Sequence, residues 1–415
     1  MRRPGALRIV AGVNSSHAGQ HHSPGAEPAG SAVTVGEVID VLEGHYPRGS
    51  AEDWDRVGLV HGDRSWPATR ALLAVDVTRA VVAEAIEIGA DLIVAHHPLL
   101  LRGINAVDGA DPKGAVLLEL GGHRIACYVA HTNADIATDG VCAALAEAIG
   151  LTDLTPLDPR PARRLDQLVT FVPTEHTSAV VDALAGAGAG TVGDYDRCHF
   201  TVAGTGSFRP LQGSSPFIGA TDQITEVTEN RVEMVLPRGR RAAVVSALLR
   251  AHPYEEPAWH VTELAPGPGE VGIGRVGTIV GTDSGDTGSM SAAEFAQRVA
   301  DALPTTVSGV RLAGDPGRNV HRVAVLAGAG DSHLAAARGC GADLYLTSDL
   351  RHHPASEALE HADAPVLLDV AHWAAEWTWL PLLATILGED APTLDVTVST
   401  LRTDPWMASF QPAGR

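Results

Sequence analysis

An alternation of short apolar runs with helix-like segments occurs twice in this chain and constrains its fold most strongly. The apolar runs lie at 71–77, 91–97 and 125–130 in the first series, and at 323–328, 343–348 and 366–370 in the second. Continuous apolar runs separated by helices are typical of parallel strands that are buried on both faces. The sequence therefore predicts an α/β fold with two similar lobes, each built on a mostly parallel sheet.

The segment between the two series has a different pattern. Residues 165–265 show the order strand–helix–strand–strand–helix–strand, which is the ferredoxin-like order, and a Pro/Gly-rich stretch follows at 266–269. This pattern predicts an inserted ferredoxin-like α+β domain. The expected organisation is a disordered tail at 1–32, a first lobe at 33–164, the inserted domain at 165–268 and a second lobe at 269–415.

Composition excludes several classes of function. The 415 residues include 50 acidic and 30 basic side chains, and the net charge of −20 would repel the phosphates of a nucleic acid. The single lysine, Lys113, lies outside any GxxxxGK[ST] motif, so this is not a P-loop NTPase. No apolar run approaches the roughly 18–20 residues of a membrane span. The four cysteines form no CxxC pair, and we expect a cytoplasmic protein with reduced thiols.

Candidate metal ligands follow the apolar runs of the first series. His96 and His97 come at the end of one run, where a turning chain can direct both imidazoles to one cluster. The alternative is a pair of hydrogen-bonded histidines that stiffens a turn. Asp135 follows the next run and offers a carboxylate oxygen, while His131 is either a further ligand or a proton carrier.

The second series ends in a matching pair. His372 and Glu376 lie four positions apart, so they share one face of a helix, although a surface pair is the alternative. With His96, His97 and Asp135 there are five candidate ligands, more than one tetrahedral zinc takes. Five ligands suit two divalent metal ions about 3.5–4 Å apart, with a bridging water as the hydrolytic nucleophile. Zinc, manganese, iron and nickel all accept such ligands.

The motifs WDRVGL, AHHPLL, HTNAD, GADLYLTSDLRHHPASEA and AHWAAE begin at residues 54, 95, 131, 341 and 371. In this order they resemble the NIF-three-like family of dinuclear metal proteins, often labelled GTP cyclohydrolase I type 2 homologues. The resemblance implies that the same five residues are the metal ligands and that the chain forms a toroidal homohexamer. The segments 193–200, 204–210 and 252–259 resemble the PII-like or CutA-like insertion of longer members, which implies a trimer contact there.

Further residues carry weaker signals. Gly330 and Ser332 lie in a glycine-rich turn between a strand and a helix, where backbone N–H groups could contact a substrate anion, and a simple tight turn is the alternative. His353 aligns with a family histidine. Together with His131 it is a candidate acid/base or substrate-contacting residue.

Two hypotheses for function follow. The first is a metal-dependent hydrolase that acts on a nucleotide-like or phosphorylated small molecule, either as a cyclohydrolase or as a phosphoesterase. The second is a non-enzymatic hexameric scaffold or regulator, in which the PII-like insertion senses a small-molecule effector.

Overall fold

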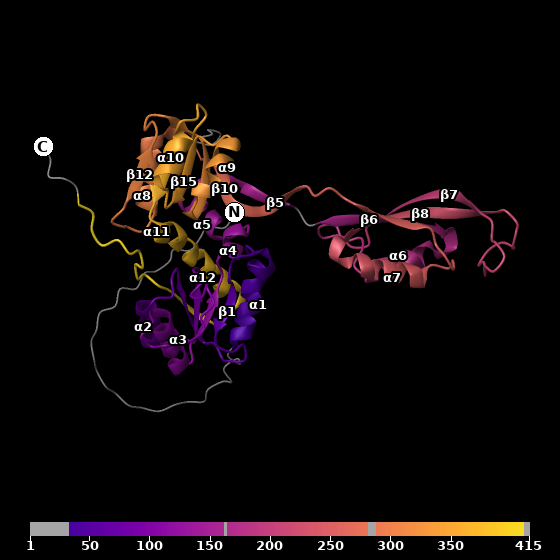
Figure 1. The fold of residues 1–415 in the computed structure, drawn as a ribbon, viewed down its shortest axis with the longest axis horizontal. Coiled ribbons are helices and arrows are strands. Elements are labelled where there is room, and N and C mark those ends of the chain that lie inside the picture. The colour runs from indigo at the N-terminus through magenta and orange to yellow at the C-terminus, as the bar shows by residue number, and fades with distance from the viewer. Residues whose placement is uncertain (1–32, 162–163, 281–287, 411–415) are drawn as a thin grey trace, which may run out of the picture.

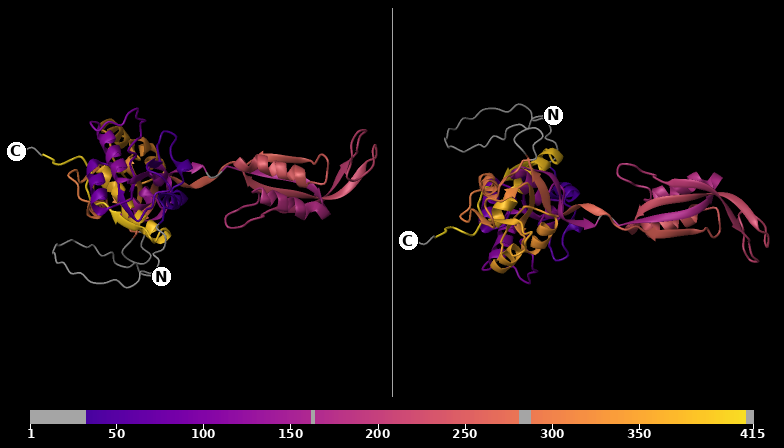
Figure 2. Two further views of the ribbon diagram at one scale, coloured as in Figure 1. Left: turned by 90° about the horizontal axis from the view of Figure 1, so that it is seen from below. Right: turned by 90° about the horizontal axis from the view of Figure 1, so that it is seen from above.

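The computed structural model describes residues 33–161, 164–280 and 288–410 (Figure 1). The tail predicted at 1–32 lies outside the described residues. The described chain forms a two-lobed body, and an elongated module projects from it in each view (Figure 2). Within these residues, no helix combines the length and the apolar character needed to cross a bilayer.

Twelve α-helices and four 3-10 turns are present in the described ranges. The helices are α1 (Val35–His45), α2 (Arg79–Ile88), α3 (Pro112–His123), α4 (Thr132–Ile136), α5 (Val141–Ala148), α6 (Thr177–Gly186), α7 (Arg241–Ala251), α8 (Ala292–Ala302), α9 (Leu334–Gly339), α10 (His352–Leu359), α11 (His372–Trp377) and α12 (Trp379–Asp390). The 3-10 turns are η1 (Arg48–Ser50), η2 (Thr174–His176), η3 (Arg238–Arg240) and η4 (Asp331–His333). Helix α1 begins at a capping box, because Thr34 and Glu37 each accept the other's backbone N–H.

The first sheet has the order β1-β4-β3-β2-β17. Its strands are β1 (Gly58–His61), β2 (Arg70–Ala74), β3 (Leu92–Ala95), β4 (Ala126–Val129) and β17 (Asp395–Val398). All neighbours pair in parallel except β1, which lies antiparallel at the edge. Alternate side chains of β2 pack against α2 and α3 on one face and against α1 and α12 on the other. Burial on both faces explains why these strands are continuous apolar runs.

The second sheet has the order β12-β16-β15-β14-β10-β5. Its strands are β5 (Leu151–Pro161), β10 (Pro268–Ile279), β12 (Val310–Ala313), β14 (Arg322–Ala329), β15 (Leu344–Ser348) and β16 (Val366–Val370), and a separate two-stranded ribbon joins β11 (Met290–Ser291) to β13 (Asn319–Val320). The three strands predicted from the apolar runs are parallel, while β5, β10 and β12 add antiparallel pairs. The prediction of an α/β fold is confirmed, and this second sheet is mixed.

The two lobes exchange strands. β5 lies in the predicted first lobe by sequence, yet it pairs with β10 in the second sheet. Conversely, β17 pairs in parallel with β2 of the first sheet. The expected division at 33–164 and 269–415 therefore does not follow the sheets, because backbone pairing of two distant segments decides which sheet each strand joins. One hydrophobic core joins the sheets, and the fully buried Trp379 of α12 belongs to it.

The inserted segment forms a four-stranded antiparallel sheet in the order β7-β8-β6-β9. Its strands are β6 (Leu165–Pro173), β7 (Phe200–Phe208), β8 (Thr225–Pro237) and β9 (Trp259–Glu263). Helices α6 and α7 cover one face (Figure 1) and close a core of their own. This is the ferredoxin-like arrangement. Strands β5 and β10 form a long ribbon that carries the module (Figure 2).

We predict that the body folds without the inserted module. Pro161 and Pro268 pair at the outer end of the ribbon, so a short turn can join β5 directly to β10 as a hairpin. Replacing residues 162–267 with a glycine-containing turn should leave a monodisperse protein with the same metal content as the full chain. Size-exclusion chromatography with elemental analysis tests this, and an aggregated, metal-free product would mean that the body depends on the module.

Candidate metal centre

The five candidate ligands come from the carboxyl ends of strands in both sheets. His96 and His97 directly follow β3, and Asp135 lies on α4 after β4. His372 and Glu376 lie on α11, which begins one residue after β16. The carboxyl ends of parallel strands are the usual location of ligand sites in open α/β sheets. In this protein the carboxyl-end edges of the two sheets meet at the cluster.

Glu376 is the centre of the cluster. Its Oε1 lies 2.7 Å from Nε2 of His372 and 3.4 Å from Nε2 of His96, and its Oε2 lies 2.9 Å from Nε2 of His97. Asp135 completes the group, with Oδ1 3.7 Å from Nε2 of His96. The structure thus brings all five predicted ligands together, from two halves of the chain.

Each histidine is oriented by its second ring nitrogen. Nδ1 of His97 hydrogen-bonds to Asp76 at 2.7 Å, and Nδ1 of His372 to Asp349 at 2.7 Å. Nδ1 of His96 lies 2.9 Å from the carbonyl oxygen of Ala130. These contacts direct the three Nε2 atoms into the cluster, which is the arrangement of histidine ligands in metal sites.

The charges of the cluster are strongly coupled. Burial opposes ionisation of Glu376, but the neighbouring imidazoles lower its pKa well below the usual range. Burial lowers the pKa of His97, yet Glu376 and Asp76 outweigh this effect and raise it to about 11. For His372, Glu376 and Asp349 likewise overcome burial and raise the pKa to about 10. The buried carboxylate therefore requires positive charge around it.

The cluster fits a divalent metal on a second ground. Among the described residues, Nε2 of His96 and Oδ1 of Asp135 are buried and make no hydrogen bond, and Oε2 of Glu376, although 2.9 Å from Nε2 of His97, does not meet it with hydrogen-bond geometry. Leaving buried polar atoms without partners costs about 1–3 kcal/mol each. These are nitrogen and oxygen donors of the kind that zinc, manganese, iron and nickel accept. Two groups of side chains have ligand atoms within 4.8 Å of one another, which is close enough to hold a metal ion. One group is His96, His97 and His131, and the other is His97, His372 and Glu376.

His131 lies at the edge of the cluster. Its ring centroid is 5.2 Å from that of His96 and 5.7 Å from that of His97. Its Nδ1 hydrogen-bonds at 2.8 Å to Asp55, whose other oxygen accepts the backbone N–H of Thr132 at 3.0 Å. Burial of Asp55 is outweighed by these bonds, which lower the pKa of its carboxyl. Asp55 therefore stays ionised and holds the imidazole in place.

His353 is not joined to this cluster by any contact among the described residues. It is exposed at the start of α10, where its ring lies beside that of His352. The chain turns away after Asp349 and Leu350, whose positions are fixed by hydrogen bonds to His372 and Asp369. Its proposed role stays a prediction that the geometry of this chain does not support.

Gly330 and Ser332 form a turn rather than an open anion site. The Gly330 carbonyl accepts the hydroxyl of Tyr345 at 2.9 Å, and the Ser332 hydroxyl lies 3.0 Å from Nδ1 of His333. The helix that follows, α9, has six residues, too few for a strong dipole. The tight-turn alternative accounts for both residues.

Gly328, in the same glycine-rich segment, does contribute to the centre. Its φ is +82°, and a Cβ there would lie 2.9 Å from Oε1 of Glu376 and 3.3 Å from Nε2 of His372. Sequence reasoning offered either anion binding or a tight turn for this segment. It missed that the glycine lets a strand approach the ligands closely, and it also missed Asp55, Asp76 and Asp349.

The fold and the cluster define an α/β protein with a histidine–carboxylate centre suited to divalent metals. The model of the Duf34/NIF3 (NGG1p interacting factor 3) family matches residues 33–405, so the chain belongs to this family. The expected resemblance is thereby confirmed.

Bacterial relatives agree with this family assignment. A Mycobacterium leprae protein named "GTP cyclohydrolase 1 type 2 homolog" is 47% identical, over 90% of this chain and 94% of its own length. A Bacillus subtilis protein of the same name is 39% identical, over 78% of this chain and 84% of its own length. The crystal structure of a Bacillus cereus protein related to NIF3 superposes with a TM-score of 0.70 at 34% identity, covering 91% of this chain and 99% of the other.

We predict that the carboxylates behind the histidines tune metal affinity. The negative charge of Asp76 orients His97 and raises the basicity of its imidazole, and Asp349 does the same for His372. Asp76→Asn or Asp349→Asn removes that charge. Metal affinity should fall about 10–100-fold while the fold is retained. Competition with a chelator of known affinity measures this, with Asp395→Asn on β17 as an exposed control. Unchanged affinity in both variants would show that these contacts do not support the ligands.

Gly328→Ala tests the close approach of β14. The added Cβ would force Glu376 or His372 to move, and the positive φ disfavours alanine. We expect metal content to fall in this variant, whereas Gly339→Ala, where a Cβ meets nothing within 4 Å, should keep it. Elemental analysis of both proteins decides, and full occupancy in Gly328→Ala would contradict the assigned role.

Proposed function

We propose that this protein is a hydrolase that uses two divalent metal ions to act on a nucleotide-like or phosphorylated small molecule. The observation that carries this proposal is the convergence of five candidate ligand side chains, three of which have a buried ligand atom that makes no hydrogen bond among the described residues. The residues that would hold the ions are His96, His97, Asp135, His372 and Glu376. When bound, such ions polarise a substrate oxygen and lower the pKa of water to about 7.

The chain's own residues supply the remaining chemistry. Asp55 engages Nδ1 of His131, which leaves Nε2 as the nitrogen available for proton transfer. His131 lies beside His96 and His97 and is not needed to complete the five ligands. It would take a proton from attacking water and return it to the leaving group, a contribution of about 10²–10⁴-fold. Glu376 keeps the ligands together through its three imidazole contacts.

The relatives' name, GTP cyclohydrolase 1 type 2 homolog, points to a purine nucleotide as one substrate class. Ring opening of a purine and hydrolysis of a phosphoester both begin with the attack of water on an electrophilic centre. Either reaction is compatible with the same cluster. Buried or half-buried free cysteines agree with a reducing, cytoplasmic location.

The experiment compares metal content with turnover. Glu376→Gln should lower bound metal to one ion or none per chain, because it removes the charge at the centre of the cluster. His131→Ala should keep both ions and lose about 10²–10⁴-fold in turnover of nucleotides and generic phosphoesters between pH 6 and 9. His353→Ala serves as a matched control on an exposed histidine. Loss of metal in His131→Ala would make it a ligand, and absence of turnover by the metal-loaded wild type would overturn the hydrolase.

A second candidate function is a hexameric metal-binding regulator with a sensing module. It is favoured by a cavity of about 930 Å³ in the inserted module, whose lining includes Phe171, Phe208, Phe217 and Tyr254. Aromatic walls with a few polar groups are typical of small-molecule sites. Effector-dependent change in metal affinity, measured with and without the module, would favour this function over the hydrolase.

We extend the proposal to a homohexamer in which the inserted modules form the trimer contacts. Support comes from Phe200 and Val202 of β7, which are 64% and 47% exposed. Their register partners, Glu233 and Arg231, alternate with the core residues of β8, so this is the face away from α6 and α7. Exposed apolar side chains on one sheet face indicate contact with a partner. Light scattering of wild type and Phe200→Glu measures the assembly, and an unchanged mass would contradict this contact.

A further inference from the structure

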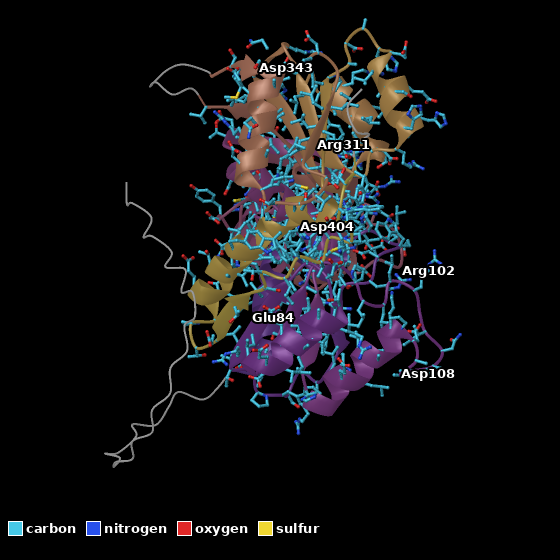
Figure 3. The ribbon with its side chains drawn as sticks, turned by 90° about the vertical axis from the view of Figure 1, so that its left-hand side faces the viewer. Glu84, Arg102, Asp108, Arg311, Asp343 and Asp404 are labelled. Carbon is cyan, nitrogen blue, oxygen red and sulfur yellow. The ribbon has the colours of Figure 1, made fainter. Side chains whose placement is uncertain are left out.

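A cavity of about 440 Å³ adjoins the metal centre. The cluster contributes His97 and His372 to its lining, and the carboxylates behind them, Asp76 and Asp349, also line it. Its lining also includes Arg311 of β12 and the segment 403–406 that follows β17. Figure 3 shows Asp404 between the two lobes and Arg311 on the side of the second lobe. A cavity of this size accommodates a small organic ligand.

The segment after β17 is fixed to the body at several points. The Ser399 hydroxyl donates to Glu84 of α2 at 2.6 Å, and the Ser399 carbonyl accepts the indole N–H of Trp377 at 2.9 Å. The Thr403 hydroxyl donates to Asp76, the carboxylate that also orients His97. This wall of the cavity is therefore positioned by the same carboxylate that positions a candidate metal ligand.

Asp404 is the unusual residue of this wall. It is 6% exposed, and its Oδ2 is buried without a hydrogen bond among the described residues. Burial raises the pKa of its carboxyl, against the opposing effects of Arg402 and of a hydrogen bond from the Trp406 backbone. An unpaired buried carboxylate oxygen is costly, and the cost is recovered when a ligand donates to it. An ionised carboxylate accepts hydrogen bonds only, so the matching ligand group carries N–H or O–H donors.

Trp406 supplies a flat apolar surface beside Asp404. Its side chain lines the same cavity, yet it is 64% exposed. A large aromatic ring that borders a cavity without being covered is suited to stack on a planar ligand, and stacking of a nucleobase contributes about 1–3 kcal/mol. Arg311 is held on one side by Asp369, with Nε 2.9 Å from Oδ2. Its guanidinium therefore presents positive charge to an anionic group in the cavity.

We propose that Asp404 and Trp406 form a subsite for a planar nitrogen heterocycle with two neighbouring N–H donors. One donor is for the unpartnered Oδ2 of Asp404 and one is for the second lone pair of the other carboxylate oxygen. Guanine has such an edge, formed by its ring N–H and its exocyclic amino group. Hypoxanthine, the base of inosine, has the ring N–H but no neighbouring amino group. Adenine has no ring N–H on this edge, so it lacks the pair of donors. This inference rests on the proposed function, because the cavity adjoins the metal centre, and it names the substrate class that the centre would take.

The test is binding of nucleoside monophosphates to the metal-loaded full-length protein, measured by calorimetry. We expect the order guanosine, inosine, adenosine monophosphate, with ribose 5-phosphate weakest. Asp404→Asn replaces an acceptor by a mixed donor and acceptor, so guanosine monophosphate should lose about 10–100-fold in affinity. Trp406→Ala should weaken all three nucleotides by about 5–150-fold and leave ribose 5-phosphate unchanged.

Matched controls separate the subsite from general damage. Asp363→Asn changes an exposed aspartate of the second lobe, and Trp259→Ala removes an indole in the inserted module; both variants should bind as wild type. Equal affinity of wild type for guanosine and adenosine monophosphate, or unchanged affinity in Asp404→Asn, would overturn the subsite. If Asp404→Asn fails to fold, Trp406→Ala and the wild-type nucleotide order still decide. Binding does not require turnover, so this result stands apart from failure of the hydrolase.

Discussion

The buried carboxylate of Glu376 among three imidazoles is the interaction on which the architecture of this protein depends. Two of the histidines come from the end of β3 and one from α11, so the carboxylate joins both sheets at a single point. A buried charge without partners is strongly destabilising. The lobes must therefore meet in one orientation for the carboxylate to be satisfied, and α11 and α12 between the sheets fix that orientation.

The pattern of apolar residues predicted the strands of the fold, because a strand that is buried on both faces of a sheet needs a continuous run of apolar residues. The parallel strands β2, β3 and β4 and their counterparts β14, β15 and β16 were all anticipated in this way. The exchange of β5 and β17 was not anticipated. Which sheet a strand joins depends on backbone hydrogen bonds between segments far apart in the chain, and side-chain periodicity carries no record of that partner.

The residues of the candidate site likewise fall into those that local sequence features predicted and those that they did not. His96, His97, Asp135, His372 and Glu376 stand out because strand-end position and helical spacing are local features. Asp55, Asp76 and Asp349 act through a hydrogen bond to another residue's second ring nitrogen, and a lone aspartate after a strand resembles an ordinary turn residue. No sequence feature indicated Asp404 either, because what distinguishes it is a buried carboxylate oxygen without a hydrogen-bond partner among the described residues, and this is visible only in three dimensions.

The placement of β17 has a consequence for how the protein is made. The first sheet includes a strand from near residue 398, so it stays incomplete during translation until almost all of the described chain has left the ribosome. The residues on α11 emerge shortly before that strand. The growing chain thus exposes the histidines after β3 long before Glu376 exists to pair with them. The metal ions of the proposed function could therefore be held by all five ligands only late in synthesis, once α11 has emerged.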